Sequence, residues 1–239
     1  MAKRANDRQA STPVGKDGPH HPAFARESPE TLQRLRIYAE LLKKWNPTIN
    51  LVGPKTLDQI WIRHFADSLQ VSDALPEARR WMDLGSGAGF PGLVTAIRYA
   101  DDPQARVHLL ESDQRKCAFL REVSRETGAP ATICCERIEK FLPSFHEPIE
   151  AVSARALAPL PILLRYAENL IAKGAIGVFS KGEHAEAELT DSFTASKYLI
   201  TTMESRTCAS ARLVIVRRRP DLNEDRSLDQ EPDGKLRTI

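Results

Sequence analysis

The sequence predicts an α/β fold with a mostly parallel sheet, helices on both of its faces, an antiparallel hairpin at its end and an N-terminal helical cap. Three observations carry this prediction. Apolar strands alternate with helical segments from Arg80 onward, a glycine-rich run follows the first strand, and acidic residues stand at two strand ends. Repeated strand–helix units build parallel sheets with helices on both faces. A chain of 239 residues has room for one such domain and a small extension.

Composition divides the chain into four parts. Residues 1–26 are polar without apolar periodicity and are expected to be a disordered tail. Residues 27–76 are expected to form the helical cap, and residues 77–218 the main domain. Alternating charges with Pro and Asp predict a second disordered tail over residues 219–239.

The cap is expected to consist of two helices. Ser28 is a suitable N-cap and Pro29 suits the first helical position, so the first helix begins there. Asn46-Pro47 is expected to end it, because proline interrupts helical hydrogen bonding. A second helix is expected to begin at its cap, Thr56, and to run through Leu69.

The main domain continues the alternation. Its last two strands lie close together in the sequence, which predicts an antiparallel pair. Strands are expected from Arg80 and at Val107–Glu111, Ala131–Cys135, Ala151–Ser153, Ala175–Ser180, Lys197–Thr202 and Ala211–Arg218. Helices are expected at Arg115–Glu126, Leu160–Ile171 and Glu183–Ser196, and a short turn at Arg137–Phe141.

The run Asp83–Gly92 indicates a binding loop. Its glycines Gly85, Gly87 and Gly89 leave backbone amides free to close around a small molecule at a helix N-terminus. A dinucleotide site has Gly-x-Gly-x-x-Gly, whereas this spacing is Gly-x-Gly-x-Gly. Asp83, just before the loop, would repel a pyrophosphate but suits a ligand with an ammonium group. The combination resembles the first motif of the Rossmann-like class I S-adenosylmethionine (SAM) methyltransferases.

A second acid fits the same ligand. Glu111 ends an apolar strand about twenty residues after the glycine loop and is followed by Ser112-Asp113, a helix cap. Neighbouring parallel strands bring their carboxyl ends to one edge of the sheet. We therefore expect Glu111 to accept hydrogen bonds from the ribose hydroxyls of an adenosine.

Other features limit the chemistry. The four cysteines (Cys117, Cys134, Cys135 and Cys208) show no Cys-x-x-Cys spacing, so no metal site is expected. Neither a membrane-spanning apolar run nor a signal peptide is apparent, which predicts a cytoplasmic protein. The loop after the fourth strand offers Arg155, whose guanidinium can hold a carboxylate, a phosphate or a guanine edge, or simply pair with a surface acid.

Five segments together resemble the RsmG (GidB) family, whose bacterial members methylate guanine N7 in 16S ribosomal RNA. They are Asn46–Leu51, Arg63–Leu69, Asp83–Gly92, Arg155-Ala156 and Lys181-Gly182. One departure is Ser-Ala-Arg before Ala156, where many members have Ser-Arg.

The resemblance implies which residues hold SAM. It assigns this role to Gly85, Phe90, Ile138, Glu139 and Arg155, while the residue pattern adds Asp83, Gly87, Gly89 and Glu111. It further implies that residues 77–218 form a SAM-dependent methyltransferase domain. The implied partner is 16S rRNA in the small ribosomal subunit, met by a monomeric protein without metal.

The implied reaction asks for no catalytic acid or base. Guanine N7 carries a lone pair and no proton, so approach and electrostatics suffice. With a net charge of only +2, RNA requires a local basic face. Candidates are Arg63, Arg155, Lys181 and Arg217–Arg219. His64 and Asp67, three residues apart, are expected to pair on a helix surface, with RNA contact or packing in the cap as the alternative.

Three alternatives remain at this stage. A SAM-dependent methyltransferase of a small molecule or protein would modify ribosome-free substrates. A non-catalytic RNA-binding module would bind rRNA without transferring a methyl group. A nicotinamide dehydrogenase would respond to NAD instead of SAM in a thermal shift.

Overall fold

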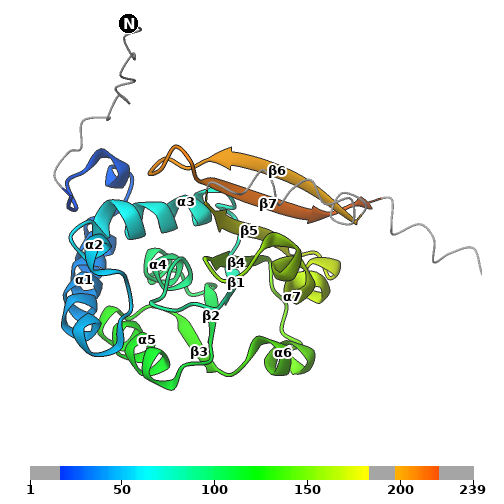
Figure 1. The fold of residues 1–239 in the computed structure, drawn as a ribbon, viewed down its shortest axis with the longest axis horizontal. Helices are drawn as coiled ribbons and strands as arrows, with labels where there is room; N and C mark the ends of the chain where they lie inside the picture. The colour runs from blue at the N-terminus through cyan, green and yellow to red at the C-terminus, as the bar shows by residue number, and fades with distance from the viewer. Residues whose placement is uncertain (1–16, 183–196, 221–239) are drawn as a thin grey trace, which may run out of the picture.

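The computed structural model describes residues 17–182 and 197–220, and its centre is one seven-stranded sheet (Figure 1). The strand order is β3-β2-β1-β4-β5-β7-β6, with β7 antiparallel to both of its neighbours and the other pairs parallel. The α/β class and the terminal antiparallel hairpin are thus confirmed. The strands are β1 (Arg80–Leu84), β2 (Arg106–Glu111), β3 (Ala131–Cys135), β4 (Ala151–Arg155), β5 (Ile176–Lys181), β6 (Tyr198–Glu204) and β7 (Arg212–Arg218).

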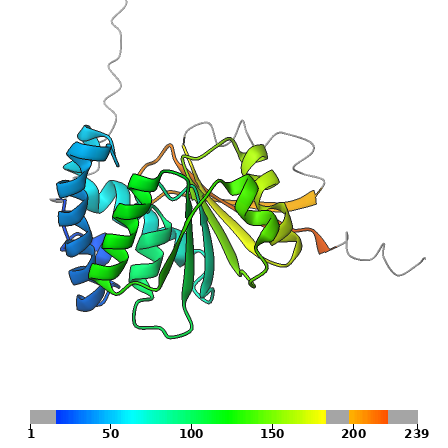
Figure 2. The ribbon, with the colours of Figure 1, turned by 90° about the horizontal axis from the view of Figure 1, so that it is seen from below.

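Helices cover both faces of the sheet (Figure 2). The cap helix α1 (Pro29–Ile49) packs on α5 (Gln114–Thr127) and α4 (Gly92–Arg98) over one face, and α3 (Asp67–Asp73) packs on α4. The other face carries α7 (Leu160–Ala172), which contacts β4, β5 and β7, and the short α6 (Ile138–Phe141).

The two faces have separate hydrophobic cores because side chains alternate along each strand. In β1, Trp81 is buried in the core beneath α1, α4 and α5, while Met82 and Leu84, on the opposite face, are buried in the core beneath α7. The same alternation directs Asp83 toward the side of Trp81 and α4.

The first cap helix is longer than the sequence predicts. It begins at Pro29 with Ser28 as N-cap, as expected, but contains Pro47 and ends at Ile49, followed by Asn50 with a φ of 49°. A proline in the last turn removes only one backbone donor. The side chain of Asn46 stabilises the exit by accepting a hydrogen bond from the Val52 amide at 2.8 Å. The prediction that Asn46-Pro47 ends the helix is wrong.

The second cap helix is divided into three pieces. The one-turn α2 (Pro54–Leu57) follows its N-cap Gly53, a π-helix covers Trp61–Ala66, and α3 comes next. The expected cap, Thr56, therefore lies inside α2. The Asp17 carboxylate accepts hydrogen bonds from the amides of Trp61 and Ile62 at 3.2 and 2.9 Å, which satisfies donors where the new segment starts.

The prediction of a disordered tail over residues 1–26 is wrong for its last part. Residues 17–26 pack on the cap, and Pro22–Phe24 form a 3₁₀ turn. Phe24 is 2% exposed and meets Trp61 edge-to-face with ring centroids 5.3 Å apart. A lone buried phenylalanine gives no periodic signal, so composition alone did not reveal it. Residues 1–16, the expected helix over 183–196 and the expected tail beyond residue 220 lie outside the described residues.

The remaining elements follow the predicted boundaries closely. Asp113 caps α5 by accepting from the amides of Arg115 and Lys116. The short turn expected at Arg137–Phe141 is the one-turn helix α6. Within the described ranges, no helix is both long enough and apolar enough to cross a membrane.

Candidate functional site

The glycine loop joins β1 to α4 and takes a conformation that favours glycine. Gly85, Gly87 and Gly89 have φ values of 64°, 56° and 98°, in the left-handed region that L side chains rarely adopt. The Gly87 amide donates to Glu111 Oε2 at 2.9 Å, so the loop is fixed to the end of β2.

The three glycines serve different purposes. Gly85 and Gly87 line a cavity of about 620 Å³ at the carboxyl ends of β1, β2 and β4. Gly89 instead faces the cap, and a Cβ there would lie 2.6 Å from Tyr38 Oη and 2.8 Å from Leu93 Cβ. The Tyr38 hydroxyl donates to the Ala88 carbonyl. Gly89 is thus needed for packing of the loop against α1 and does not line the cavity.

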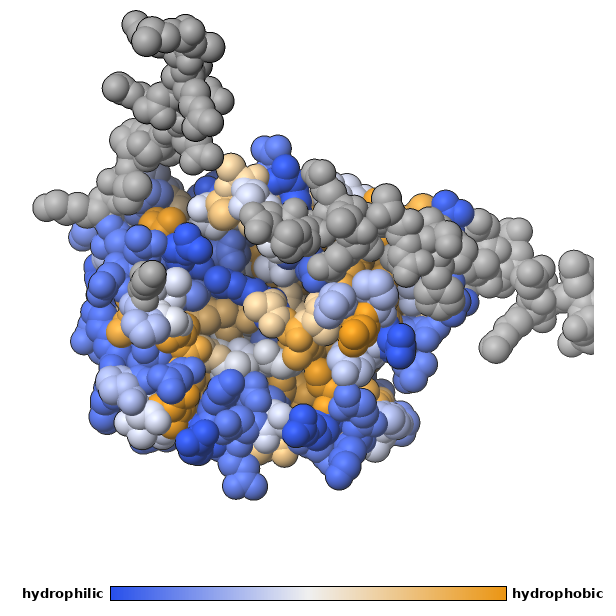
Figure 3. Space-filling model, in the orientation of Figure 1, coloured by the Kyte–Doolittle hydropathy of each residue, from blue (hydrophilic) through white to orange (hydrophobic). Residues whose placement is uncertain are grey.

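Most of the predicted cofactor-binding residues meet around this one cavity. Carboxyl ends of parallel strands are where open α/β sheets bind ligands. The wall includes Gly85, Gly87, Phe90, Glu111, Ile138, Glu139 and Arg155. Figure 3 shows apolar residues gathered near the centre of this view, with hydrophilic residues around them.

Asp83 is a predicted cofactor-binding residue that does not line the cavity. Its side chain is fully buried. Ser153 Oγ donates to Asp83 Oδ1 at 2.6 Å, and burial raises the pKa of this carboxyl to about 6. The structure thus contradicts a direct contact between Asp83 and a ligand ammonium. The carboxylate instead joins β1 to β4 beneath the start of α4.

Glu111 lies at the cavity, as predicted. Its two carboxylate oxygens accept from the amides of Gly87 and Asp113 at 2.9 and 2.8 Å, which fixes the side chain at the rim. A carboxylate oxygen has more than one lone pair, so each can accept a further bond from a ribose hydroxyl.

We expect Glu111→Ala to weaken SAM binding by about ten- to hundredfold. The change removes a charge-assisted hydrogen bond, worth ~1.5–3 kcal/mol, and frees the Gly87 amide. Calorimetric titration with SAM measures the effect. Glu40→Ala, on the exposed side of α1, is the matched control and should bind as the wild type does. Unchanged affinity in Glu111→Ala would remove this residue from the site.

The far end of the cavity is bounded by α6 and α7. Ile138 is 9% exposed and offers an apolar surface. Tyr166 Oη donates to Glu139 Oε1 at 2.7 Å, and this bond lowers the pKa of the Glu139 carboxyl. Tyr166 was missed by the sequence analysis because nothing in its helical stripe distinguishes it from a packing residue.

His64 does not pair with Asp67. Its ring stacks on Phe90 with centroids 4.7 Å apart and planes inclined by 14°, and both ring nitrogens are buried without a partner among the described residues. Burial, with the nearby Arg155 and Arg63, lowers the pKa of His64 to about 3. The imidazole is therefore neutral at physiological pH, and packing in the cap is the outcome that the structure supports.

Asp67 pairs with Arg155 instead. Arg155 Nη1 lies 3.2 Å from Asp67 Oδ2, and Arg155 Nη2 donates to the Arg63 carbonyl at 2.9 Å. Asp67 also accepts from Gln70 Nε2 at 2.9 Å and Thr207 Oγ1 at 2.8 Å. Burial is the main reason that the pKa of Arg155 is lowered. The acid that pairs with Arg155 is therefore a largely buried one, held by α3 and by the β6–β7 loop.

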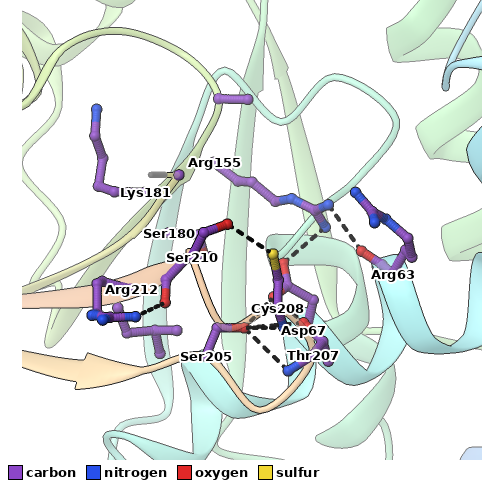
Figure 4. A pocket seen from close by; sticks show the side chains of 14 residues that line it. Arg63, Asp67, Arg155, Ser180, Lys181, Ser205, Thr207, Cys208, Ser210 and Arg212 are labelled. Carbon is purple, nitrogen blue, oxygen red and sulfur yellow. Dashed lines mark hydrogen bonds and ion pairs between the residues drawn. The ribbon is translucent and has the colours of Figure 1, made fainter. Parts of the chain in front are cut away.

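A second cavity of about 320 Å³ adjoins the first (Figure 4). The two share Arg155 and Ala156 as lining residues. Lys181 and Arg63 line the second cavity, as does Arg212, whereas Arg217–Arg219 do not. The β6–β7 loop supplies Ser205 and other residues of this wall. Its contribution depends on long-range packing, for which the sequence has no local signal.

No metal centre accompanies these cavities in the part of the chain that is described. There, no group of three or more His, Cys, Asp or Glu side chains is arranged to hold a metal ion. What the arrangement offers is a cofactor-sized cavity with an acid at its rim, joined through Arg155 to a smaller basic cavity.

Comparison with known proteins yields consistent matches. Residues 31–213 match the family described as GidB, rRNA small subunit methyltransferase G. A protein of Methylorubrum populi named ribosomal RNA small subunit methyltransferase G is 48% identical over 79% of this chain and 89% of its own. A Parvibaculum lavamentivorans protein of the same name is 52% identical over 70% of this chain and 74% of its own.

Solved structures show a similar fold at low identity. The O-methyltransferase TomG from Streptomyces achromogenes, in complex with SAM, has a TM-score of 0.54 at 13% identity and covers 78% of this chain and 90% of its own. A mutant of MtNAS in complex with S-adenosylmethionine has a TM-score of 0.51 at 11% identity, and the match covers 79% of this chain and 76% of its own.

Proposed function

Because the chain belongs to the GidB family of rRNA small subunit methyltransferases, we propose that it transfers a methyl group from SAM to N7 of a guanine in 16S ribosomal RNA. The observation that carries the proposal is the junction of the two cavities at Arg155. There a cofactor cavity with a glycine loop opens beside a basic cavity suited to RNA. The chemistry of each side matches one of the two reactants.

The residues of the larger cavity fit SAM. Glu111 suits the ribose hydroxyls, Ile138 suits the adenine ring, and Arg155 offers its positive charge to the methionine carboxylate from the side that the two cavities share. When bound, SAM supplies an electrophilic methyl group on a sulfonium. The backbone amides of the glycine loop and the stacked Phe90 would orient the donor.

Guanine N7 as acceptor agrees with the state of His64, the imidazole at the cofactor cavity. N7 carries no proton, so its methylation needs none to be removed. His64, the imidazole at the cofactor cavity, has a pKa lowered to about 3 and is a weak base. Asp67 is bonded to Arg155 and to neutral donors. Positioning and exclusion of water are then the main contributions of the chain.

The RNA context completes the proposal. We infer that the protein acts as a monomer in the cytoplasm and meets the RNA within the small ribosomal subunit. The sequence and the positions of Arg63 and Lys181 at the second cavity support an RNA partner.

We expect mass mapping of 16S rRNA from a deletion strain to show one guanine lighter by a methyl group. The purified protein and tritiated SAM should restore the modification in small subunits from that strain. An activity on free small molecules or proteins alone would favour the broader methyltransferase alternative. Binding of rRNA without transfer of tritium would favour a non-catalytic module.

A further inference from the structure

The second cavity has a composition that distinguishes it from the cofactor cavity. Four cationic side chains line it, contributed by four separate segments: Arg63, Arg155, Lys181 and Arg212. Among the described residues that line it, the one carboxylate is Asp67, which already pairs with Arg155 and accepts from neutral donors. None of the described residues that line it is aromatic, so it provides no ring on which a base would stack.

The cations lie on both sides of the hollow. Figure 4 shows Arg63 and Arg155 close together on one side, with Lys181 and Arg212 on the other. Arg155 is held beside Arg63 by its hydrogen bond to the Arg63 carbonyl at 2.9 Å. Two like charges so placed repel each other, and an anion between them would relieve the repulsion.

Two polar groups of the cavity are available for such an anion. The Arg63 side chain is exposed, and no described residue accepts a hydrogen bond from its guanidinium. The buried hydroxyl of Ser180, also on the cavity wall, has no hydrogen-bond partner among the described residues. A guanidinium and a hydroxyl are both donors that proteins use for phosphate oxygens.

We propose that the second cavity is a phosphate site, in which Arg63, Arg155 and Ser180 hold one phosphodiester of the RNA strand beside the target nucleotide. The shared residue Arg155 places this phosphate next to the cofactor cavity, so binding of the strand fixes the distance between the target base and the methyl donor. The inference rests on the proposed RNA substrate. It specifies a single cavity that holds one phosphate, whereas a basic face would be a broad surface. Arg217–Arg219 are not part of this cavity.

The test uses the full chain and unmodified small subunits from a deletion strain. Arg63→Gln removes the charge from an exposed side chain, and Ser180→Ala removes the hydroxyl donor without changing charge. The matched control is Arg36→Gln, since Arg36 is an exposed arginine of α1 that lines neither cavity. Filter binding of subunits is measured over a series of KCl concentrations, and SAM binding is measured by calorimetry.

Arg63→Gln should lower affinity for subunits about tenfold, as expected for the loss of one charge-assisted bond. It should also reduce the slope of log affinity against log salt by about 0.7–0.9, the value for one phosphate. Ser180→Ala should lower affinity severalfold with an unchanged slope. Arg36→Gln should match the wild type, and all three variants should bind SAM within about twofold of it.

Several outcomes would overturn the proposal. A wild-type salt slope in Arg63→Gln would show that this arginine does not neutralise a phosphate. A loss of SAM affinity in parallel with subunit affinity would assign the cavity to the cofactor. Wild-type behaviour in Ser180→Ala would remove the hydroxyl from the site. Failure of the proposed function is separate: the wild-type protein would then bind subunits without methylating their RNA.

Discussion

Replacement of Arg155 by alanine is expected to lower the kcat/KM of methyl transfer to small subunits by about a hundredfold. The guanidinium lines both cavities and can therefore bind both reactants. The loss of one charge-assisted hydrogen bond to each reactant, at ~1.5 kcal/mol each, gives a change of this size. Arg155→Lys should be nearly as damaging, because lysine keeps the charge but not the planar fork that contacts Asp67 and the Arg63 carbonyl together. Steady-state kinetics with tritiated SAM measures both variants.

Stability must be separated from activity in this experiment. Removing Arg155 leaves Asp67 buried without its cation, which costs about 3–5 kcal/mol for buried pairs in general. The double variant Arg155→Met/Asp67→Asn removes both charges and should recover much of the lost thermal stability without recovering activity. Recovery of activity in that variant would reduce the pair to a structural role. Full activity of Arg155→Lys would show that charge alone is needed.

Gly92→Ala is expected to lower the free energy of unfolding by about 3 kcal/mol, the upper part of the usual range for an overpacked core. A Cβ at Gly92 would lie 2.4 Å from Asp83 Cβ and 2.5 Å from Leu109 Cδ2. Asp83 and Leu109 lie on adjacent central strands and are fully buried, so neither can move freely. The backbone of Gly92 has ordinary helical torsions, which makes the effect one of contact alone.

Urea denaturation measures the change through the midpoint at constant slope. Gly182→Ala is the control, since a Cβ there has no neighbour within 4 Å among the described residues and φ lies outside the left-handed region. It should stay within about 0.5 kcal/mol of the wild type. Equal midpoints for both variants would show that α4 can shift on the sheet without cost.

The strands, and the gathering of most candidate site residues around one cavity, could be predicted because their signals are local. Apolar runs identify the strands, and the residues at strand ends, such as Glu111 and Arg155, meet at one edge by topology. The orientation of the Asp83 side chain could also have been predicted from the alternation of residues along the strand. It shares a face with Trp81 in a strand, so a residue two positions from a buried tryptophan is directed beneath α4 rather than into the cavity.

Other features depend on contacts between distant residues. The amides at the start of the π-helical segment are bonded by Asp17, more than forty residues earlier. The pairing of Asp67 with Arg155 replaces the local pair with His64 because the fold brings β4 to the start of α3. Neither a residue propensity nor a periodic pattern predicts such long-range contacts. These two contacts position residues at or near the candidate site.

The hydrogen bond from Thr207 to Asp67 has a consequence for synthesis of the protein. The two residues are 140 positions apart, so the contact cannot form until the β6–β7 loop has left the ribosome. A nascent chain that ends before β6 possesses the walls of the larger cavity, which come from residues up to Tyr166, but lacks the hairpin side of the smaller one. The smaller cavity is therefore completed last, and the sheet with it, because β7 pairs with β5 and supplies the buried residues Leu213, Val214 and Val216.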